Sequence, residues 1–418
     1  MKIIIRKLFL KIVKWLDDTR IIIIKGARRS GKTTLLYQIK NYLEKNNQKV
    51  VMFSADQELD NPIFQNSKLF YKFLVEQYLD KDKRLYVLID ECQYIPNASI
   101  FLKTLYDISL NKIKLIVTGS SILELLKTKE PLTGRKIEFE LERFSFSEYL
   151  SFASEYKYGH QFHLEKDFSL LKEFYDIYKK DLEEHFLDYI NWGGYPEVCT
   201  EKKIDRKKLY LKEIIKTYIE KDIAQFFHIE NINKFNNLIR ILCHQAAELL
   251  NKSEIANTIG IHLKTLEKYI NLLQGTFIIT LLHPYFTNIR KELSKMPKIF
   301  INDTGIIKYY TNFEYYEYGL IDGLLIENFV FTQMKTKDIE MNYYRTISKS
   351  EIDFILKKDS SVIPAEVKFR KKVSVPVAVK NFLKNYNQDK AIIFTQNCLD
   401  KKDNIFFIPV VLTDFIFI

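Results

Sequence analysis

The stretch that decides the fold is IIIIKGARRSGKT at residues 21–33. The β-branched run 21–25 is typical of a buried parallel strand. Gly26, Gly31, Lys32 and Thr33 then match the pattern G-x-x-x-x-G-K-[ST] in full. The segment that follows, TTLLYQIKNYLEKN, has helical periodicity. Strand, loop and helix in this order predict a loop whose backbone N–H groups face the phosphates of a nucleotide.

The loop supplies the expected contacts to ATP. We predict that Lys32 reaches the β- and γ-phosphates as a catalytic cation and that the Thr33 hydroxyl binds Mg²⁺. The predicted cofactor-binding residues of this segment are Gly26, Ala27, Arg28, Arg29, Ser30, Gly31, Lys32, Thr33 and Thr34.

A second motif follows in the apolar run LYVLIDE at 85–91, which ends in two carboxylates. Behind a complete phosphate loop, we predict that Asp90 holds Mg²⁺ and that Glu91 polarises the attacking water as a general base. A third strand within 112–121 ends in small polar residues. Thr118 and Ser120 are expected either to touch the γ-phosphate or the attacking water, or to lie in a plain strand-to-helix turn capped by a serine.

Two further strands are predicted at 50–54 and 136–141. Alternating strands and helices predict a parallel sheet that binds nucleotide at the carboxyl ends of its strands. The turn just before the last strand carries Arg135. We predict that Arg135 is a catalytic arginine that reaches the phosphates of a neighbouring subunit in a homo-oligomer, or an equivalent phosphate sensor. The alternative is a surface salt bridge.

Several motifs together resemble one protein family. The segments GARRSGKTTLL, DECQYIP, TGSS, TGR and FSFSEYL look like an AAA+-type P-loop ATPase family of archaea and bacteria. Its members carry a C-terminal domain of unknown function related to PD-(D/E)xK nucleases. The chain departs from the family at Cys92, usually isoleucine, and at Arg143 and Phe144, often proline and leucine. The nucleotide residues are untouched, so the resemblance implies Mg²⁺-dependent ATP hydrolysis.

The middle of the chain is predicted to be mainly helical. Residues 151–235 form the expected helical lid or linker, with a long helix at 206–227. WGGYPEV at 192–198 interrupts it, and its paired glycines and proline indicate a fixed turn. Contact of this turn with nucleotide or with a neighbouring subunit is the alternative.

A helix-turn-helix is predicted at 251–275. Ser253 is expected to cap a first helix, Gly260 makes the turn, and a second helix runs from Leu263 to Gly275. The segment 277–303 is predicted to form a hairpin wing, which would make 236–318 a winged-helix domain. If the second helix enters a major groove, the exposed readers are His262, Lys264, Thr265 and Lys268.

Positive charge gathers around this motif. Residues 261–300 contain six basic and two acidic side chains: Lys264, Lys268, Arg290, Lys291, Lys295 and Lys298 against Glu267 and Glu292. This surplus supports nonspecific contact with DNA phosphates. Winged helices also serve as protein–protein modules, so a structural coupling role stays open.

The region 319–418 resembles a PD-(D/E)xK nuclease core. A helix at 323–334 carries Glu327, and the strands that follow carry Asp353, Glu366 and Lys368. Because strand side chains alternate, Glu366 and Lys368 share one face and Val367 is expected to point to the core. By the resemblance, Glu327, Asp353 and Glu366 would bind Mg²⁺, and Lys368 would orient the attacking water as a catalytic residue with Asp353 and Glu366. Whether this domain cleaves nucleic acid stays open.

Composition limits the classes of protein. The chain has 418 residues, a net charge of +11 and 47% hydrophobic residues, which excludes a disordered or collagen-like chain. Four separated cysteines suggest neither a disulfide framework nor a zinc site. No apolar run reaches the length of a membrane helix, and 406–418 is expected to be a strand. The basic N-terminal helix is expected either to pack on the next domain or to seek a surface. We therefore expect a cytoplasmic protein without stable membrane insertion.

The resulting prediction is an α/β protein with four parts. A P-loop NTPase parallel sheet at 1–150 precedes the helical lid (151–235), the winged helix (236–318) and a C-terminal α/β restriction-endonuclease-like domain (319–418). The predicted function is ATP-driven and Mg²⁺-dependent action on DNA. The alternative is a nucleotide-dependent switch or scaffold without nuclease activity.

Overall fold

The computed structural model describes residues 4–58, 61–80, 83–109, 111–119, 132–155, 157–158, 160–223, 228–285, 295–311, 316–337, 339–346, 348, 350–359 and 361–417. The chain divides into two compact units. Unit 1 comprises residues 1–143 and 275–277, and unit 2 comprises 144–274 and 278–418. The chain therefore passes between the units at three points. The finer domain boundaries at 150, 235 and 318 stay predictions.

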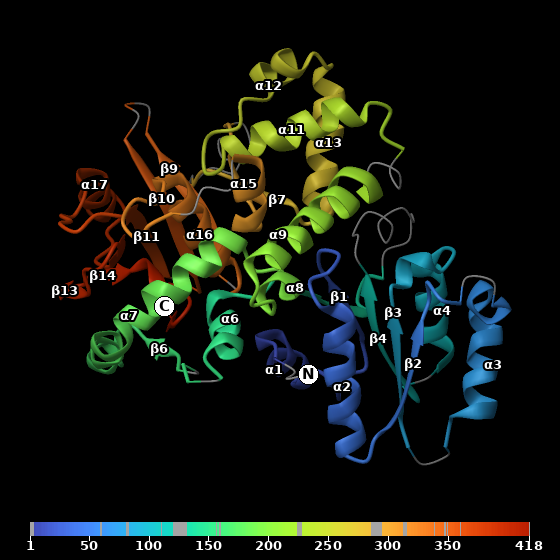
Figure 1. Cartoon of the computed structure of the whole chain (residues 1–418). Coiled ribbons are helices and arrows are strands. Elements are labelled where there is room, and N and C mark those ends of the chain that lie inside the picture. Colours follow the sequence, from blue (N-terminus) through green and yellow to red (C-terminus); the bar gives the residue numbers. More distant parts are fainter. Residues whose placement is uncertain are drawn as a thin grey trace. The chain divides into compact units, whose positions relative to one another are not determined.

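Unit 1 contains a five-stranded sheet in the order β2-β3-β4-β1-β5 (Figure 1). All neighbouring strands are parallel, as the alternation of strands and helices predicts. The strands are β1 (Ile21–Lys25), β2 (Lys49–Ser54), β3 (Leu85–Asp90), β4 (Ile113–Gly119) and β5 (Lys136–Glu140). Strands β1, β3 and β4 are almost continuously apolar and buried, because helices cover both faces of the sheet.

Helices α1 (Lys7–Val13) and α2 (Lys32–Lys45) cover one face of this sheet. Ile12 and Leu16 of the N-terminal segment pack with Ile22 and Leu36 in one buried cluster. The first of the two readings of the basic N-terminal helix is therefore confirmed: it packs on the adjacent sheet.

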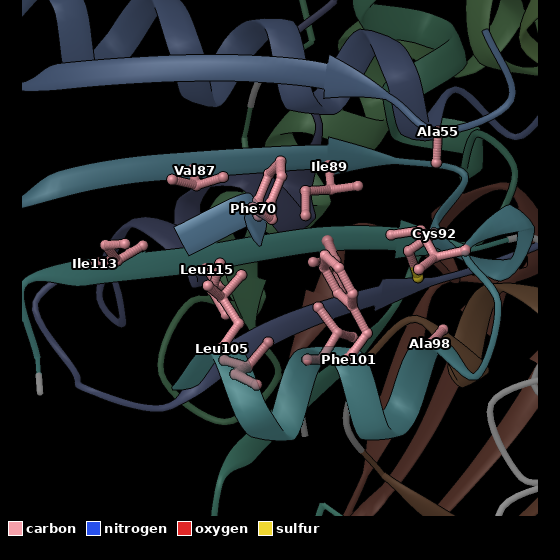
Figure 2. Close-up of a cluster of buried hydrophobic side chains, with 14 of the residues drawn as sticks. Ala55, Phe70, Val87, Ile89, Cys92, Ala98, Phe101, Leu105, Ile113 and Leu115 are labelled. Carbon is pink, nitrogen blue, oxygen red and sulfur yellow. The ribbon is translucent and has the colours of Figure 1, made fainter. Parts of the chain in front are cut away.

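The other face is covered by α3 (Ser67–Gln77) and α4 (Ala98–Ser109), with short 3-10 turns at Pro62–Gln65 and Cys92–Tyr94. Figure 2 shows Phe101 and Leu105 of α4 beside Leu115, and Phe70 near Val87 and Ile89 of strand β3. Burying two apolar layers fixes the strand ends, and the ends of β1, β3 and β4 carry the predicted nucleotide residues.

Unit 2 begins with helices. They are α6 (Phe146–Ala153), α7 (Phe168–Trp192), α8 (Pro196–Cys199) and α9 (Ile204–Glu213), and α9 continues into a π-helical stretch at Ile214–Asp222. The predicted long helix at 206–227 is thus not a uniform α-helix over its described part. The predicted turn at 192–198 is present between α7 and α8. There Gly193 has a φ of 77°, and the Asp303 carboxylate accepts from the Gly194 N–H at 2.7 Å.

The helix-turn-helix follows α11 (Ile232–His244). Helix α12 (Lys252–Ile259) ends at Gly260, which has a φ of 69°, and α13 (Leu263–Gly275) matches its predicted bounds. The cap was predicted wrongly: Asn251, rather than Ser253, accepts from the Glu254 N–H. Helix α12 starts one residue before Ser253, so Ser253 is already helical. Strands β7 (Ile279–Leu282) and β8 (Lys298–Ile301) pair antiparallel at the predicted wing.

A six-stranded mixed sheet completes unit 2, in the order β13-β14-β12-β11-β10-β9 (Figure 1). Its strands are β9 (Glu340–Arg345), β10 (Glu351–Lys358), β11 (Ser361–Lys368), β12 (Ala391–Thr395), β13 (Asp400–Lys402) and β14 (Ile405–Pro409). Helix α17 (Val377–Asn385) packs on one face through Val379 and Phe382. Helices α15 (Thr304–Thr311) and α16 (Gly323–Lys335) lie between the wing strands and this sheet in sequence.

The C-terminal segment 406–418 was expected to be one strand, but the structure divides it into separate elements. After β14, residues Val410–Leu412 form a 3-10 turn, and a short strand β15 (Ile416–Phe417) pairs in parallel with β6 (Phe162–His163). Within the described part of the chain, no helix combines the length and the apolar character needed to cross a membrane.

Candidate functional site

The phosphate loop occupies residues 26–31, between β1 and α2. Gly31 precedes the helix with a φ of 95°, a conformation that favours glycine. Gly26 is required for a different reason: a Cβ there would lie 2.4 Å from the Leu141 carbonyl oxygen. The two glycines of the motif thus allow a sharp turn and a close backbone approach.

Lys32 lies inside this loop. Its side chain is 3% exposed, and its Nζ donates to the carbonyl oxygens of Gly26 at 3.2 Å and Ala27 at 3.0 Å. The Glu91 carboxylate is 3.9 Å away. Burial lowers the pKa of Lys32, while Glu91 and Asp90 act in the opposite direction. The ammonium group is therefore held by two weak neutral acceptors that an anionic phosphate can replace.

Asp90 accepts hydrogen bonds from two of the polar side chains at the strand ends. Its Oδ2 accepts from the Thr33 hydroxyl at 2.6 Å, and its Oδ1 accepts from the Thr118 hydroxyl. The Thr118 oxygen also accepts from the Glu91 N–H at 3.1 Å. A hydroxyl and a carboxylate that meet beside the loop lysine are the oxygen ligands that Mg²⁺ prefers, so Thr33 and Asp90 fit the metal.

Glu91 has a φ of 50°, uncommon for a residue with a side chain. The Gln93 amide donates to its carboxylate, whose side chain is 20% exposed. The remaining loop residues divide by exposure: Ala27 and Ser30 are buried, whereas Arg28, Arg29 and Thr34 are exposed. Ser120 lies outside the described residues.

Sequence reasoning missed Arg6. Its guanidinium is buried and donates to the carbonyl oxygens of Ser30 at 2.8 Å, of Arg143 at 3.3 Å, and of Glu142. Arg143 in turn donates to the Phe277 carbonyl oxygen at 2.8 Å. Arg6 therefore fixes the loop carbonyl that precedes Gly31. The only sequence signal was a basic residue placed just before an amphipathic helix.

Arg135 lies at the start of β5, whereas the phosphate loop follows the end of β1. Ile21 pairs with Lys136 in a parallel register, so Arg135 lies at the amino ends of these strands. The phosphate loop of the same chain lies at their carboxyl ends. Its Nε donates to Asp107 at 2.8 Å. This surface ion pair is the alternative stated for Arg135, and a role in trans stays a prediction.

In unit 2 the residues predicted for the nuclease-like centre lie close to one another. The Asp353 carboxylate accepts from the Val367 N–H at 2.8 Å, and the Glu366 carboxylate accepts from the Asp353 N–H at 3.2 Å. Lys368 contacts Glu366 at 2.5 Å, as their shared face predicts. Val367, expected to point to the core, is half-buried, and Glu366 beside it is 5% exposed.

Lys298 of β8 lies in the same carboxylate cluster. Its Nζ is 2.9 Å from the Glu327 carboxylate, 2.6 Å from that of Glu351 and 3.7 Å from that of Asp353. Lys298 is only 3% exposed. Its inclusion among the basic residues available for DNA is therefore corrected: strand alternation places it on the same buried face as Phe300, and carboxylates neutralise it.

The predicted metal ligands of this centre do not fit a metal ion as they lie. In the described residues, no group of three or more His, Cys, Asp or Glu side chains is arranged to hold one. The physical reason is that backbone N–H groups and lysine ammonium groups already engage the oxygens of Glu327, Asp353 and Glu366.

Burial and neighbouring charges shift the pKa values of several groups in this cluster. Burial and the neighbouring Asp353 raise the pKa of Glu327 to about 8, against the lowering effect of Lys298. Burial and Asp353 likewise raise the pKa of Glu366 to about 7. Burial lowers the pKa of Lys298, yet Glu327, Asp353 and Glu351 outweigh it and the net shift is upward. Glu327 and Glu366 therefore hold a proton more tightly than an exposed glutamate does.

The predicted readers of the helix-turn-helix are accessible. His262, Lys264 and Lys268 are exposed on or just before α13, and Thr265 is half-buried. Lys295 is exposed as well, whereas Arg290, Lys291 and Glu292 lie outside the described residues. The charge surplus available to a partner is therefore carried by fewer groups than the sequence count indicates.

A separate cavity of about 310 Å³ lies in unit 2. Leu164, Leu356 and Phe406 form part of its apolar lining, and Lys358, Lys390 and Glu165 are among its charged side chains. None of the predicted site residues lines it.

Three segments of the chain match models of known protein domains. Residues 18–150 match the model of an AAA domain, residues 183–317 match a domain of unknown function (DUF8612), and residues 322–412 match another (DUF4143). The first unit therefore contains an AAA domain with a P-loop. A relation of the C-terminal region to nucleases does not emerge from these matches.

Relatives extend over most of the chain. An uncharacterized protein of Haemophilus influenzae is 24% identical over 367 residues, covering 86% of this chain and 85% of the relative. An uncharacterized protein of Methanocaldococcus jannaschii is 25% identical over 364 residues, covering 85% and 75%.

Solved structures match more loosely. AMPPCP-bound DnaA from Aquifex aeolicus is 16% identical, with a TM-score of 0.31, over 64% of this chain and 86% of that one. PCH-2 of C. elegans is 17% identical, with a TM-score of 0.29, over 37% of this chain and 47% of that one.

Proposed function

We propose that unit 1 binds ATP with Mg²⁺ and hydrolyses it, and that the helix-turn-helix of unit 2 contacts DNA. The observation that carries the first half is the convergence of Lys32, Thr33 and Asp90 at the carboxyl end of a parallel sheet. The AAA-domain match over residues 18–150 supports it independently.

Each residue has a role that follows from its position. Lys32 exchanges two backbone carbonyl acceptors for phosphate oxygens, and the N–H groups at the start of α2 face the same anion. Thr33 and Asp90 would hold Mg²⁺, which neutralises phosphate charge when bound. Glu91 accepts a proton from the attacking water, and Gln93 orients its carboxylate. Thr118 and Ser120 would contact the γ-phosphate or this water.

The Glu91 assignment separates binding from chemistry. Glu91→Gln should keep ATP binding, measured with a fluorescent ATP analogue, and lower turnover by about 10²-fold or more. Asp90→Asn should weaken the Mg²⁺ dependence instead. Full turnover in Glu91→Gln would remove Glu91 from the role of general base.

We propose DNA as the partner of α12 and α13. Support comes from the exposure of Lys264 and Lys268, four residues apart on one face of the second helix of the motif. The double variant Lys264→Glu, Lys268→Glu should lower the affinity for duplex DNA. The slope of log affinity against log salt concentration should also become shallower, by an amount that corresponds to about two phosphate contacts. The matched control is the exposed pair Lys380 and Lys384, which has the same spacing on α17. An equal loss of duplex affinity in both double variants would show that net charge, and not the position of Lys264 and Lys268, causes the effect.

The second candidate is a nucleotide-dependent switch or scaffold without nuclease activity. The specific observation that favours it over DNA cleavage is the ammonium group of Lys298 inside the carboxylate cluster. A nuclease assay with Mg²⁺ distinguishes the two. Cleavage by the wild type that is lost in Asp353→Ala establishes a nuclease, whereas equal absence of cleavage in both supports the switch.

A homo-oligomer with Arg135 acting in trans is part of the proposal. Arg135→Ala should then lower turnover without weakening ATP binding. A mixture of Arg135→Ala and Lys32→Ala subunits should regain turnover, because each supplies what the other lacks. A chain that is monomeric with ATP, or a mixture without recovery, would leave Arg135 as the surface partner of Asp107.

A further inference from the structure

Lys298 is a buried cation whose three carboxylate partners come from two other elements. It leaves β8 and meets the carboxylates of Glu327 from α16 and of Glu351 and Asp353 from β10. Strand alternation explains two of these contacts, because Glu351 and Asp353 share one face of β10. The side chain of Lys298 is only 4% exposed, and that of Glu327 is 10% exposed.

We propose that Lys298 is the resident cation of this cluster, standing where the divalent cation of a nuclease-like centre would stand. Its ammonium group supplies the positive charge that these carboxylates need, and it belongs to the wing rather than to the C-terminal sheet. The cluster is then an ion-pair lock between the β7–β8 pair and the C-terminal sheet. A divalent cation enters only when Lys298 leaves. This inference does not depend on ATP hydrolysis in unit 1.

The remaining carboxylate oxygens support this assignment. Asp353 also accepts from the Val367 N–H, and Glu366 accepts from the Asp353 N–H and from Lys368. These donors belong to the fixed backbone of β10 and β11 or to the neighbouring side chain. The oxygen pairs that would chelate a metal ion are therefore already divided among protein donors.

Charge balance points the same way. Arg345 lies 3.5 Å from the second oxygen of Glu351, so Glu351 is paired from both sides. Glu327 has Lys298 as its cation. Removal of the Lys298 ammonium group would leave Glu327 and Asp353 facing each other across its vacated position. Two carboxylates in this situation attract a hard divalent cation.

The wing keeps other contacts, with helix α16 and with strand β9, when the lysine charge is removed. Asn328 of α16, the residue after Glu327, accepts from the Ile301 N–H at 2.9 Å and donates to the Ile301 carbonyl oxygen at 2.8 Å. Phe300 stacks on Phe331 with ring centroids 4.1 Å apart. Tyr343 of β9 exchanges backbone hydrogen bonds with His283 and Tyr285. We therefore expect Lys298→Met, which keeps an unbranched apolar stem of similar length, to fold.

The experiment measures Mn²⁺ bound per full-length chain by electron paramagnetic resonance, without nucleotide. All chains carry Asp90→Asn, which removes the carboxylate that would bind a divalent cation in unit 1. With Lys298 present, we expect no Mn²⁺ bound in unit 2 at a Mn²⁺ concentration of about 0.1 mM. Lys298→Met should gain one bound Mn²⁺ per chain, and adding Glu327→Gln should weaken that binding at least about tenfold.

Lys357→Met is the matched control, because Lys357 pairs with Glu340 on the same sheet but outside the cluster. It should gain no Mn²⁺. A gain in this control equal to that of Lys298→Met, or no gain in either, would overturn the proposal.

A second measurement does not require Lys298→Met to fold. Chains with Lys298 intact are compared with and without Asp353→Asn. Equal absence of bound Mn²⁺ is the expected result. One Mn²⁺ per chain that Asp353→Asn abolishes would show that the cluster binds metal in the presence of Lys298, which would contradict the proposal.

Discussion

Replacement of Arg6 tests whether the phosphate loop is fixed from behind by the N-terminal segment. The substitution Arg6→Met removes a buried guanidinium that donates to the carbonyl oxygens of Ser30, Glu142 and Arg143. A hydrogen bond to a charged group contributes about 1.5–3 kcal/mol. Two of the three bonds are short, so we expect the free energy of unfolding of unit 1 to fall by about 3 kcal/mol.

The assay is urea unfolding followed by the fluorescence of Trp15 in unit 1, with Trp192 of unit 2 replaced by Phe in every chain compared. The chain has two tryptophans, so this variant reports unit 1 alone. With an m-value of about 2 kcal/mol/M, the midpoint should fall by about 1.5 M. Because Ser30 lies in the loop, the apparent affinity for ATP should fall about tenfold as well.

Arg20→Met is the matched control. Arg20 pairs with Asp18, but its side chain is 38% exposed and solvent screens the pair, so its loss should change the midpoint little. A midpoint for Arg6→Met that equals that of Arg20→Met would refute the claim that Arg6 supports the loop.

Three further predictions concern other parts of the chain. Gly26→Ala should destabilise unit 1 by about 1–3 kcal/mol and reduce ATP turnover, because its Cβ would meet the Leu141 carbonyl oxygen at 2.4 Å; Gly323→Ala, with open space around it, is the neutral control. Asn251→Ala should cost unit 2 about 1 kcal/mol by removing the cap of α12, and an equal loss in Ser253→Ala would contradict the cap assignment. Both are read from urea midpoints. Glu327 has a folded pKa of about 8, above its ordinary value, so unit 2 should lose stability as the pH rises from about 4.5 to 8. Glu327→Gln should flatten this slope in unfolding curves measured across that range.

The sequence predicted the local structure of the phosphate loop because the residues that form it are close together in the chain. Gly26, Gly31 and Lys32 lie within seven residues, and one strand and one helix fix them. The contact between Thr33 and Asp90 is long-range, yet it follows from the rule that parallel strands bring their carboxyl ends to one edge.

The contacts that the sequence could not predict are side-chain pairs across separate elements. Arg6 reaches Glu142 over a separation of 136 residues, and Lys298 reaches Glu327 over 29. No periodicity marks such partners. In the segment KIFI at 298–301, a lysine two residues before the buried Phe300 was the only sign that Lys298 lies on a buried face. Counting it as surface charge assumed that lysines are exposed.

The chemistry expected of 319–418 was limited for a related reason. Spacing places Glu366 and Lys368 on one face, and they do make contact. Spacing does not show which donors engage the oxygens of Asp353 and Glu366. Those donors are backbone N–H groups of the adjacent strand, which depend on register and not on residue type.

The central claim is that unit 1 hydrolyses ATP at its phosphate loop. The most direct measurement is steady-state release of phosphate from ATP with Mg²⁺ by the wild type, Lys32→Ala and Lys40→Ala. Lys40 is half-buried on the same helix and pairs with Glu44 away from the loop, so its loss should leave turnover unchanged. We predict Mg²⁺-dependent turnover in the wild type and in Lys40→Ala, and none above background in Lys32→Ala. Equal turnover in Lys32→Ala would contradict the claim.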